Sequence, residues 1–180
     1  MIGNETIWGK YEKLETMGQG VYGKVYKARC RQNSEIVAIK KTAYDPEGIA
    51  ASTVREIAML KRIGSHANIV QLQQVYRYPS KNDPSTLNIL VVMEYADYDL
   101  QRFIENYNPL PVDQIKSFTF QILNGLKHCH ELGIIHRDLK PGNILVHAGH
   151  IIKIADFGLS RRQYFPQVAV SPNVCIFNSF

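Results

Sequence analysis

Two polar segments that follow each other closely constrain this chain more than any other feature. The first is His-Arg-Asp-Leu-Lys-Pro-Gly-Asn at residues 136–143, and the second is Asp-Phe-Gly at residues 156–158. Apolar runs at 143–146 and 151–154 predict two short strands joined by a turn between the two segments. The chance that both segments arise in this order without a shared purpose is very small, so we expect the fold to bring their polar side chains together.

The residue types in these two segments suit phosphoryl transfer. Asp138 is the candidate general base, because its carboxylate would orient a hydroxyl group and accept its proton, an effect of roughly 10²–10⁴-fold. Lys140 would neutralise charge on the transferring group. Asn143 and Asp156 would hold Mg²⁺, a hard cation that prefers oxygen ligands and bridges phosphates. The alternative, ordinary polar loops, would have to account for all four residues at once.

A glycine-rich turn lies near the N-terminus. Gly18, Gly20 and Gly23 fit the spacing G-x-G-x-x-G, which also opens dinucleotide-binding folds. In those folds a helix follows the turn, whereas residues 24–28 continue here as a strand. We therefore expect a β-hairpin lid, in which glycines let backbone N–H groups approach phosphates.

A lysine on the next strand is the second candidate for phosphate binding. Lys40 ends the segment Val-Ala-Ile-Lys, and Glu56 lies on a helix expected at 52–63 with Ser52 as its N-cap. An ion pair between them would direct the ammonium group toward the α- and β-phosphates. Lys41 should point to the opposite face of the strand, and we assign it no catalytic role.

The periodicity of the chain predicts an α+β fold in two linked halves. Short apolar runs separated by turns dominate the first hundred residues, and helical periodicity follows. The expected strands are 11–17, 21–29, 36–41, 69–75 and 87–95, and the expected later helices are 100–106 and 112–132. The expected organisation is an N-terminal extension at 1–10, a strand-rich lobe at 11–95, a partial helical lobe at 96–162 and an irregular tail at 163–180.

Charge and hydropathy exclude several classes of protein. The formal net charge is +5, but Lys and Arg are dispersed, so we expect no direct binding of nucleic acid. The longest apolar stretch, residues 89–93, is too short to span a bilayer, and the N-terminus lacks a secretory signal pattern. We expect a soluble protein of the cytoplasm or the nucleus, with no membrane association.

The cysteines and histidines do not form a convincing metal site. Three separated cysteines without a Cys-x-x-Cys pair favour a reducing compartment over a disulfide framework or structural zinc. His128, Cys129, His130 and His136 look like ligands, but adjacent helical residues point in different directions. A buried helix with polar edges is the simpler interpretation.

Together these segments resemble the eukaryotic protein kinase superfamily and, within it, the cyclin-dependent kinases, over residues 11–162. The finer assignment rests on residues 18–28, 52–61 and 93–100, which are similar to that family's lid, cyclin-facing helix and hinge, with Val54 where the family has isoleucine. The resemblance implies a complete β-rich N-lobe and the start of a helical C-lobe. It also implies ATP and Mg²⁺ as cofactors and Ser or Thr of a protein substrate as acceptor.

The resemblance also implies a nucleotide site at the junction of the two halves. Adenine would bind the backbone of Glu94 and Ala96. Other nucleotide-binding positions, besides the three glycines, Lys40 and Asp156, would be Val25, Ala38, Met93, Asp99 and Leu145.

Regulation is implied by the same resemblance. A cyclin-like activator would push the helix of Glu56 inward. Arg55, Arg137 and Arg161 would collect the phosphate of an activation loop, a charge-assisted ordering switch. These arginines are present although the residues after 162 do not match the family's loop.

Two further positions concern phosphorylation. Tyr22 matches the family's inhibitory phosphorylation site, whereas Val21 replaces the threonine often used beside it. Ser171 precedes a proline at about the distance from Asp156 expected of an activating site, but its neighbours differ from the family's loop. We hypothesise that Ser171 is not an activating phosphosite.

The chain lacks the segment Ala-Pro-Glu that follows Asp-Phe-Gly in a complete kinase, and it ends 22 residues after Gly158. We therefore expect truncation after the Asp-Phe-Gly segment and loss of the peptide platform. Two hypotheses remain open: a cyclin-dependent-like kinase whose sequence is incomplete here, and a truncated module that binds a cyclin or nucleotide without catalysis. A third, a dinucleotide-dependent enzyme, is disfavoured by the strand after Gly23.

Overall fold

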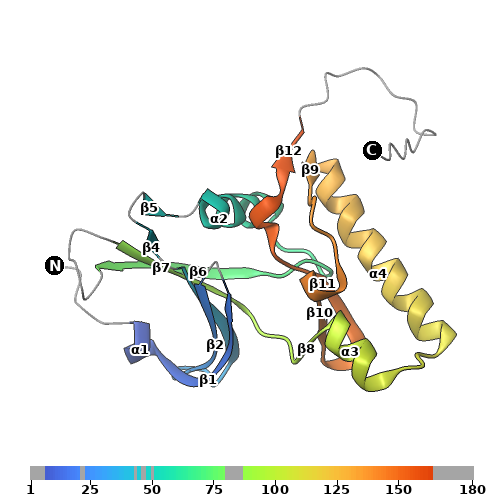
Figure 1. The fold of residues 1–180 in the computed structure, drawn as a ribbon, viewed down its shortest axis with the longest axis horizontal. Helices are drawn as coiled ribbons and strands as arrows, with labels where there is room; N and C mark the ends of the chain where they lie inside the picture. Colours follow the sequence, from blue (N-terminus) through green and yellow to red (C-terminus); the bar gives the residue numbers. More distant parts are fainter. Residues whose placement is uncertain are drawn as a thin grey trace.

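A computed structural model describes residues 7–20, 23–42, 44–45, 48–49, 51–79 and 87–163 of the protein. It has a strand-rich part and a part dominated by helices, with the two lying side by side (Figure 1). The expected α+β class is therefore confirmed.

The strand-rich part is a five-stranded antiparallel sheet in the order β1-β2-β3-β7-β6. Its strands are β1 (Tyr11–Gly20), β2 (Gly23–Cys30), β3 (Ile36–Lys41), β6 (Leu72–Pro79) and β7 (Leu87–Glu94). A short helix, α1 (Ile7–Lys10), precedes the sheet, and the two-residue strands β4 (Tyr44–Asp45) and β5 (Gly48–Ile49) pair with each other. The prediction of a strand immediately after the glycine turn is confirmed by β2.

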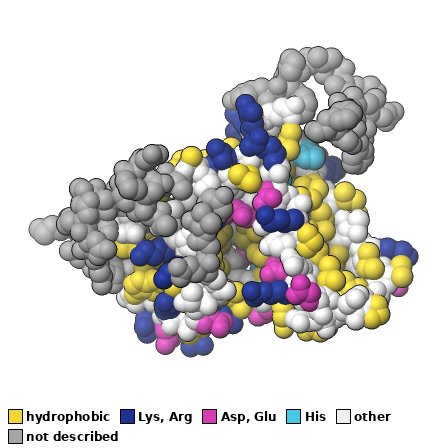
Figure 2. Space-filling view, viewed as in Figure 1, with side chains coloured by type: hydrophobic (Ala, Val, Ile, Leu, Met, Phe, Trp, Pro, Cys, Tyr) yellow, Lys and Arg dark blue, Asp and Glu magenta, His cyan; other side chains and the backbone are white. Residues whose placement is uncertain are grey.

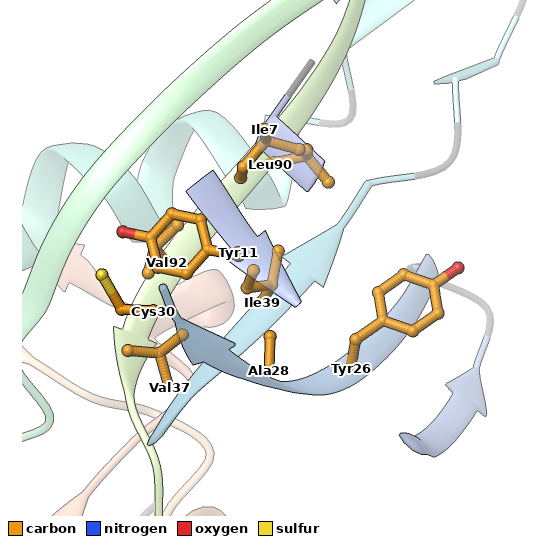
Figure 3. Close-up of a cluster of buried hydrophobic side chains, with 9 residues drawn as sticks. All are labelled: Ile7, Tyr11, Tyr26, Ala28, Cys30, Val37, Ile39, Leu90 and Val92. Carbon is orange, nitrogen blue, oxygen red and sulfur yellow. The ribbon is translucent and has the colours of Figure 1, made fainter. Parts of the chain in front are cut away.

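One face of β3 packs into a hydrophobic core, and the other carries the candidate site residues. Val37 and Ile39 are fully buried in a core under the sheet, as successive strand residues alternate between faces. The other members of this core are Ile7, Tyr11, Tyr26, Ala28, Cys30, Leu90 and Val92 (Figure 3). Ala38 and Lys40 consequently lie on the opposite face, which is the face that meets the next helix.

That helix, α2 (Ala51–Ile63), begins one residue earlier than expected. Ser52 therefore lies within its first turn, and the prediction that Ser52 is the N-cap is wrong. The buried face of α2 carries Thr53, Glu56, Leu60 and Ile63, whereas Val54 is 51% exposed.

The second part contains two principal helices, α3 (Leu100–Tyr107) and α4 (Val112–Glu131). Strand β8 (Tyr98–Asp99) precedes α3. After α4 come strands β9 (Ile134–Ile135), β10 (Ile144–His147), β11 (Ile151–Ile154) and β12 (Arg161–Arg162), and the 3₁₀ turns η1 (Pro141–Asn143), η2 (Ala148–His150) and η3 (Phe157–Leu159). Strands β11, β10 and β8 form one sheet, and β12 pairs with β9. The predicted strand pair between the two polar segments is thus present as β10 and β11.

One expected strand is displaced. Residues 69–75 were predicted to be a strand, but β6 starts at Leu72. Ile69 and Val70 are buried in the core instead, where Ile69 bridges Ile154 and the backbone N–H of Val70 donates to the carbonyl of Ile154. Their apolar character therefore reflects contact with the second part of the molecule and not membership of the first sheet.

A shared core joins the two parts. Buried residues from α2, the 69–70 segment, α4, β9, β11 and η3 pack together in it: Leu60, Ile63, Ile69, Val70, Cys129, Ile134, Ile154 and Phe157. Asn68 fastens the same junction, since its Nδ2 donates to Gln121 and to the carbonyl of Ile152, and its Oδ1 accepts from Asn124. The strand-rich part is therefore tied rigidly to α4 and β11.

Helix α4 also has an apolar outer face. Val112, Phe120 and Leu123 are 65%, 71% and 57% exposed. Figure 2 shows hydrophobic side chains spread along the side of the molecule that α4 occupies. Within the described ranges, no helix is long and apolar enough to cross a membrane.

Candidate active site

An ion pair at the centre of the molecule joins the strand-rich part to the Asp-Phe-Gly segment. Lys40 Nζ lies 2.7 Å from Glu56 Oε2 and 3.9 Å from Asp156 Oδ1. The side chain of Glu56 is only 2% exposed, and that of Lys40 is 16% exposed. The structure thus brings together the predicted lysine, its glutamate partner and the aspartate of the second polar segment.

The electrostatics of Glu56 depend on this contact. Burial raises the pKa of its carboxyl group, the Lys40 ammonium lowers the pKa, and the nearby Asp156 raises it further. The charge of Glu56 is therefore sustained by Lys40. Each charge of the pair offsets the cost of burying the other, so removal of either side chain would leave an uncompensated charge inside the protein.

The catalytic-loop residues form a second cluster. Asp138 Oδ2 accepts from Lys140 Nζ and from Asn143 Nδ2, both at 2.9 Å, and Asn143 Nδ2 also donates to the Asp138 carbonyl at 2.8 Å. The hydrogen bond from Lys140 lowers the pKa of Asp138 most, and that from Asn143 adds to the effect. The Asp138 carboxylate is consequently ionised, fixed in orientation and half-buried beside a cation.

His136 links the two clusters, a role that the sequence analysis missed. Its Nδ1 accepts from the backbone N–H of Asp138, so its Nε2 carries the proton and donates to the carbonyl of Ala155 at 2.9 Å. Its ring also packs edge-on against the buried ring of Phe157, with centroids 4.7 Å apart. Burial lowers the pKa of His136, which keeps it neutral as these contacts require. Its place within the first polar segment was the only signal in the sequence.

The backbone of the second segment positions Asp156. Asp156 adopts a left-handed conformation with φ of 60°, and its Oδ1 accepts from the N–H of Gly158. Phe157 is fully buried in the shared core. The buried ring and the left-handed turn together direct the Asp156 carboxylate, which is 45% exposed, toward Lys40.

The predicted adenine-facing residues come from two sheets. Ala38 pairs with Met93, and Val25 pairs with Lys40, in the five-stranded sheet. Leu145 pairs with Asp99 in the second part. Val25, Ala38, Met93 and Leu145 are all half-buried, so none of the four is sealed within a core.

Asp99 has an additional structural role. Its Oδ1 accepts from the backbone N–H of Arg102 at 2.8 Å, which makes Asp99 the N-cap of α3. A nucleotide-binding role for Asp99 would have to coexist with this capping bond. Sequence analysis missed the cap, although an aspartate directly before an amphipathic run is its usual signal.

The glycine turn forms the tip of the β1–β2 hairpin. Gly18 pairs with Val25 and Gly20 pairs with Gly23, and the φ of 124° at Gly23 is one that side chains rarely adopt. Tyr22 and its neighbour Val21 lie outside the described residues, as does Ser171.

Two of the three predicted phosphate-binding arginines bind the backbone at the end of Asp-Phe-Gly and directly after it. Arg55 Nη1 donates to the carbonyl of Gly158 at 2.7 Å, and Arg137 Nε donates to the carbonyl of Leu159 at 2.8 Å. Arg161 itself belongs to β12, which pairs with β9. The structure therefore brings all three to the same segment, and basic side chains gather there in Figure 2.

A second ion pair at the hinge was also missed. Glu94 Oε2 lies 2.9 Å from Lys153 Nζ of β11, and its Oε1 accepts from the backbone N–H of Gln71 at 2.6 Å. Sequence analysis assigned Glu94 only a backbone role. Its side chain joins the end of the first sheet to the second part.

The available oxygen atoms fit Mg²⁺. Asn143 uses its amide hydrogens on Asp138, which leaves its Oδ1 for a cation, and Asp156 retains Oδ2. Mg²⁺ commonly takes one or two protein ligands and completes its shell with phosphates and water. Among the described residues there is no cluster of three His, Cys, Asp or Glu that could hold a metal ion by itself. This donor set therefore suits a cation delivered with a nucleotide.

The histidine and cysteine group near the end of α4 is structural. Cys129 is fully buried, and its pKa is raised to about 11 by burial. The ring of His128 stacks on His66 at 4.6 Å, and its Nε2 contacts the carbonyl of Ile63. These contacts agree with the interpretation as a buried helix with polar edges.

Comparison with known proteins establishes the class. Residues 11–173 match the protein kinase domain family, so the chain belongs to that family. It is 42% identical over 161 residues to cell division control protein 2 homolog C of Antirrhinum majus, covering 84% of this chain and 52% of that protein. It is also 42% identical over 164 residues to cyclin-dependent kinase B1-1 of Arabidopsis thaliana, covering 84% and 53% respectively. The predicted likeness to cyclin-dependent kinases is confirmed, and the chain spans about half the length of these curated relatives.

Proposed function

We propose that the protein is an ATP-dependent serine/threonine kinase of the cyclin-dependent type, which transfers the γ-phosphate of ATP to Ser or Thr hydroxyls of proteins. The observation that carries the proposal is the contact of Lys40 with both Glu56 and Asp156 beside the Asp138 cluster. Phosphoryl transfer depends on positioned charges more than on covalent chemistry by the protein. This arrangement supplies such charges from four separate elements.

Each residue has a distinct task in the proposed reaction. Asp138 orients the substrate hydroxyl and accepts its proton, and Lys140 neutralises charge on the group in transit. Asn143 and Asp156 supply oxygen ligands for Mg²⁺, which would stabilise the phosphate charge when bound. The lowered pKa of Asp138 keeps its carboxylate ionised, which is the form that can accept a hydrogen bond from the substrate hydroxyl.

The nucleotide would lie between the two parts of the molecule. Val25, Ala38 and Leu145 enclose the base, with Met93 behind it and the backbone of Glu94 and Ala96 along its edge. The glycine hairpin covers the phosphates, and Lys40, held by Glu56, binds the α- and β-phosphates. The half-buried state of the lining side chains supports this placement.

Activation would act through α2. Arg55 on this helix binds the carbonyl of Gly158, and Glu56 beside it binds Lys40. A cyclin-like partner on the outer side of α2, where Val54 is exposed, would stabilise both contacts at once. A phosphate that meets Arg55, Arg137 and Arg161 would stabilise the same segment from the other side. Such a protein would act in the cytoplasm or the nucleus.

The test is a phosphorylation assay with purified protein, Mg-ATP and a basic protein substrate, with and without a cyclin. Asp138→Asn and Asp156→Ala are expected to abolish phosphate transfer, whereas Asp113→Asn, whose side chain is 96% exposed, should leave it unchanged. Transfer that survives Asp156→Ala would refute the proposal. Thermal stabilisation by Mg-ATP without transfer would instead support the second hypothesis, a nucleotide- or cyclin-binding module.

A further inference from the structure

Lys27 of β2 contacts two other segments of the chain at once. Its Nζ lies 4.4 Å from the centre of the Tyr95 ring and 3.4 Å from Glu15 Oε1. Glu15 belongs to β1, and Tyr95 lies directly after β7, in the connection that leads into the second part of the molecule. The three side chains therefore join both strands of the glycine hairpin to the segment between the two parts.

Lys27 lies on the sheet face that carries the predicted nucleotide-binding residues. Val25 and Lys27 are two residues apart on β2, so their side chains point to the same face of the sheet. Tyr26, between them, is buried in the core on the other face. Lys27 also pairs directly with Ala38 of β3, another predicted adenine-facing residue. The contact between Lys27 and Tyr95 is consequently beside the proposed base site, on the strand that begins at the glycine turn.

The contact of Lys27 with Tyr95 is better shielded from water than its ion pair with Glu15. The Glu15 side chain is 59% exposed, and an exposed ion pair contributes little because water screens it. The Lys27 side chain is 25% exposed, and Tyr95 is half-buried. A hydrogen bond with the Tyr95 side chain raises the pKa of Lys27, and an ammonium group over an aromatic ring is attracted by the ring's quadrupole. Tyr95 is therefore the main attachment point of Lys27.

The neighbours of Tyr95 on both sides are fixed in place. Glu94 is paired with Lys153 of β11 at 2.9 Å, and Ala96 is buried. The backbone of these two neighbours is also the part of the chain that is proposed to bind adenine. The glycine turn, by contrast, consists of residues with wide conformational freedom, so its position depends on contacts made nearer the sheet. Tyr95 provides such a contact from a segment that other interactions hold.

We propose that Tyr95 is a positioning residue for phosphoryl transfer, which holds the base of the glycine hairpin beside the nucleotide through its contact with Lys27. This role rests on the proposed function, because it concerns the same nucleotide site. Loss of the contact leaves the hairpin with more conformations, and nucleotide binding must then order it at a cost in affinity. The chemical step at Asp138 is unaffected, since neither Tyr95 nor Lys27 contacts the Asp138 cluster.

The experiment combines calorimetric titration with Mg-ATP and amide hydrogen exchange of the nucleotide-free protein. Tyr95→Leu and Lys27→Met should each weaken Mg-ATP binding about two- to fivefold, as expected of one cation–π contact, and should speed exchange in β1 and β2. The double variant should bind as the single variants do, because both changes remove the same contact. In the phosphorylation assay, KM for ATP should rise with kcat unchanged. Tyr95→Phe, which keeps the ring, should have a smaller effect and serves if Tyr95→Leu fails to fold.

Lys24→Met is the matched control, because Lys24 is an exposed lysine of the same strand whose side chain points to the other face. It removes the same charge and should change neither binding nor exchange. Hairpin exchange that is the same in the wild type, Lys27→Met and Tyr95→Leu would overturn the role of Tyr95. Losses that add in the double variant would also overturn it. A wild type that binds no Mg-ATP would refute the proposed function, and hydrogen exchange would still decide whether Tyr95 holds the hairpin.

Discussion

Replacing Lys40 by methionine should destabilise the protein in a strongly pH-dependent way. The change leaves the carboxylate of Glu56, 2% exposed, without the ammonium that lies 2.7 Å from it. Removing one partner of a buried pair typically costs about 3–5 kcal/mol. Lys41→Met is the matched control, because Lys41 is the next residue on β3 and its Nζ lies 6.0 Å from the ring of Tyr78 on the other face.

Protonation of Glu56 limits how much stability Lys40→Met can lose. The unpaired carboxylate can take up a proton. Protonating a carboxyl group with the ordinary pKa of 4.5 at pH 7, which is 2.5 pH units higher, costs about 3.4 kcal/mol at 1.36 kcal/mol per unit. At pH 5 the same step requires only about 0.7 kcal/mol. A carboxyl group with a raised pKa in the folded state binds more protons there than in the unfolded state. The stability of Lys40→Met should therefore fall as pH rises from 5 to 7.

Urea unfolding at pH 5 and pH 7 measures this effect. Relative to wild type, Lys40→Met should lose about 3 kcal/mol at pH 7 and distinctly less at pH 5, whereas Lys41→Met should lose under about 1 kcal/mol at both. Adding Glu56→Leu to Lys40→Met should restore most of the stability and remove the pH dependence, because it replaces the buried pair by apolar groups. Equal losses for Lys40→Met and Lys41→Met, or a loss in Lys40→Met that does not vary with pH, would refute the reasoning.

Three other outcomes are expected. Gly125→Ala should destabilise the protein by about 1–3 kcal/mol in urea unfolding, because the added Cβ would lie 2.8 Å from the backbone oxygen of Asn68; a neutral result would mean that α4 shifts freely. Lys153→Met should raise the KM for ATP more than it lowers kcat, since it releases the side chain of Glu94, whose backbone is proposed to bind adenine; an unchanged KM would contradict this. Burial lowers the pKa of His136, so its contribution to stability is present above pH 6.5 and is lost as pH falls below that value; His136→Phe should flatten this part of the pH profile, and an identical profile would contradict the assignment.

The alternation of residues along the sequence predicted correctly which side chains of β3 face Glu56. The period of two along β3 correctly separated Lys40, beside Glu56, from Lys41, beside Tyr78. The same local reasoning distinguished the β-hairpin from a dinucleotide-binding turn, because residues after Gly23 continue as a strand. These features depend on neighbours in the sequence, which is the information that periodicity contains.

Long-range contacts account for what the sequence did not predict. Ile69 and Val70 have strand-like composition, but their partner is Ile154, far along the chain, so they leave the first sheet. Glu94 has a side-chain partner in Lys153, and no spacing rule connects two residues that far apart. Patterns of apolar residues show that a segment is buried, but they do not identify the element that buries it.

The long-range contacts explain why the proposed activity should be sensitive to α2. One turn of this helix carries Arg55, bound to Gly158, and Glu56, bound to Lys40, so a displacement of α2 breaks both contacts together. Phe157, which lies between Asp156 and Gly158 in the sequence, is buried in the core that α2 shares with α4. The Asp156 carboxylate therefore reaches Lys40 only while α2 is seated on that core. A partner that stabilises α2 would act on the phosphate-binding lysine and on the proposed Mg²⁺ ligand as one unit, without contacting either.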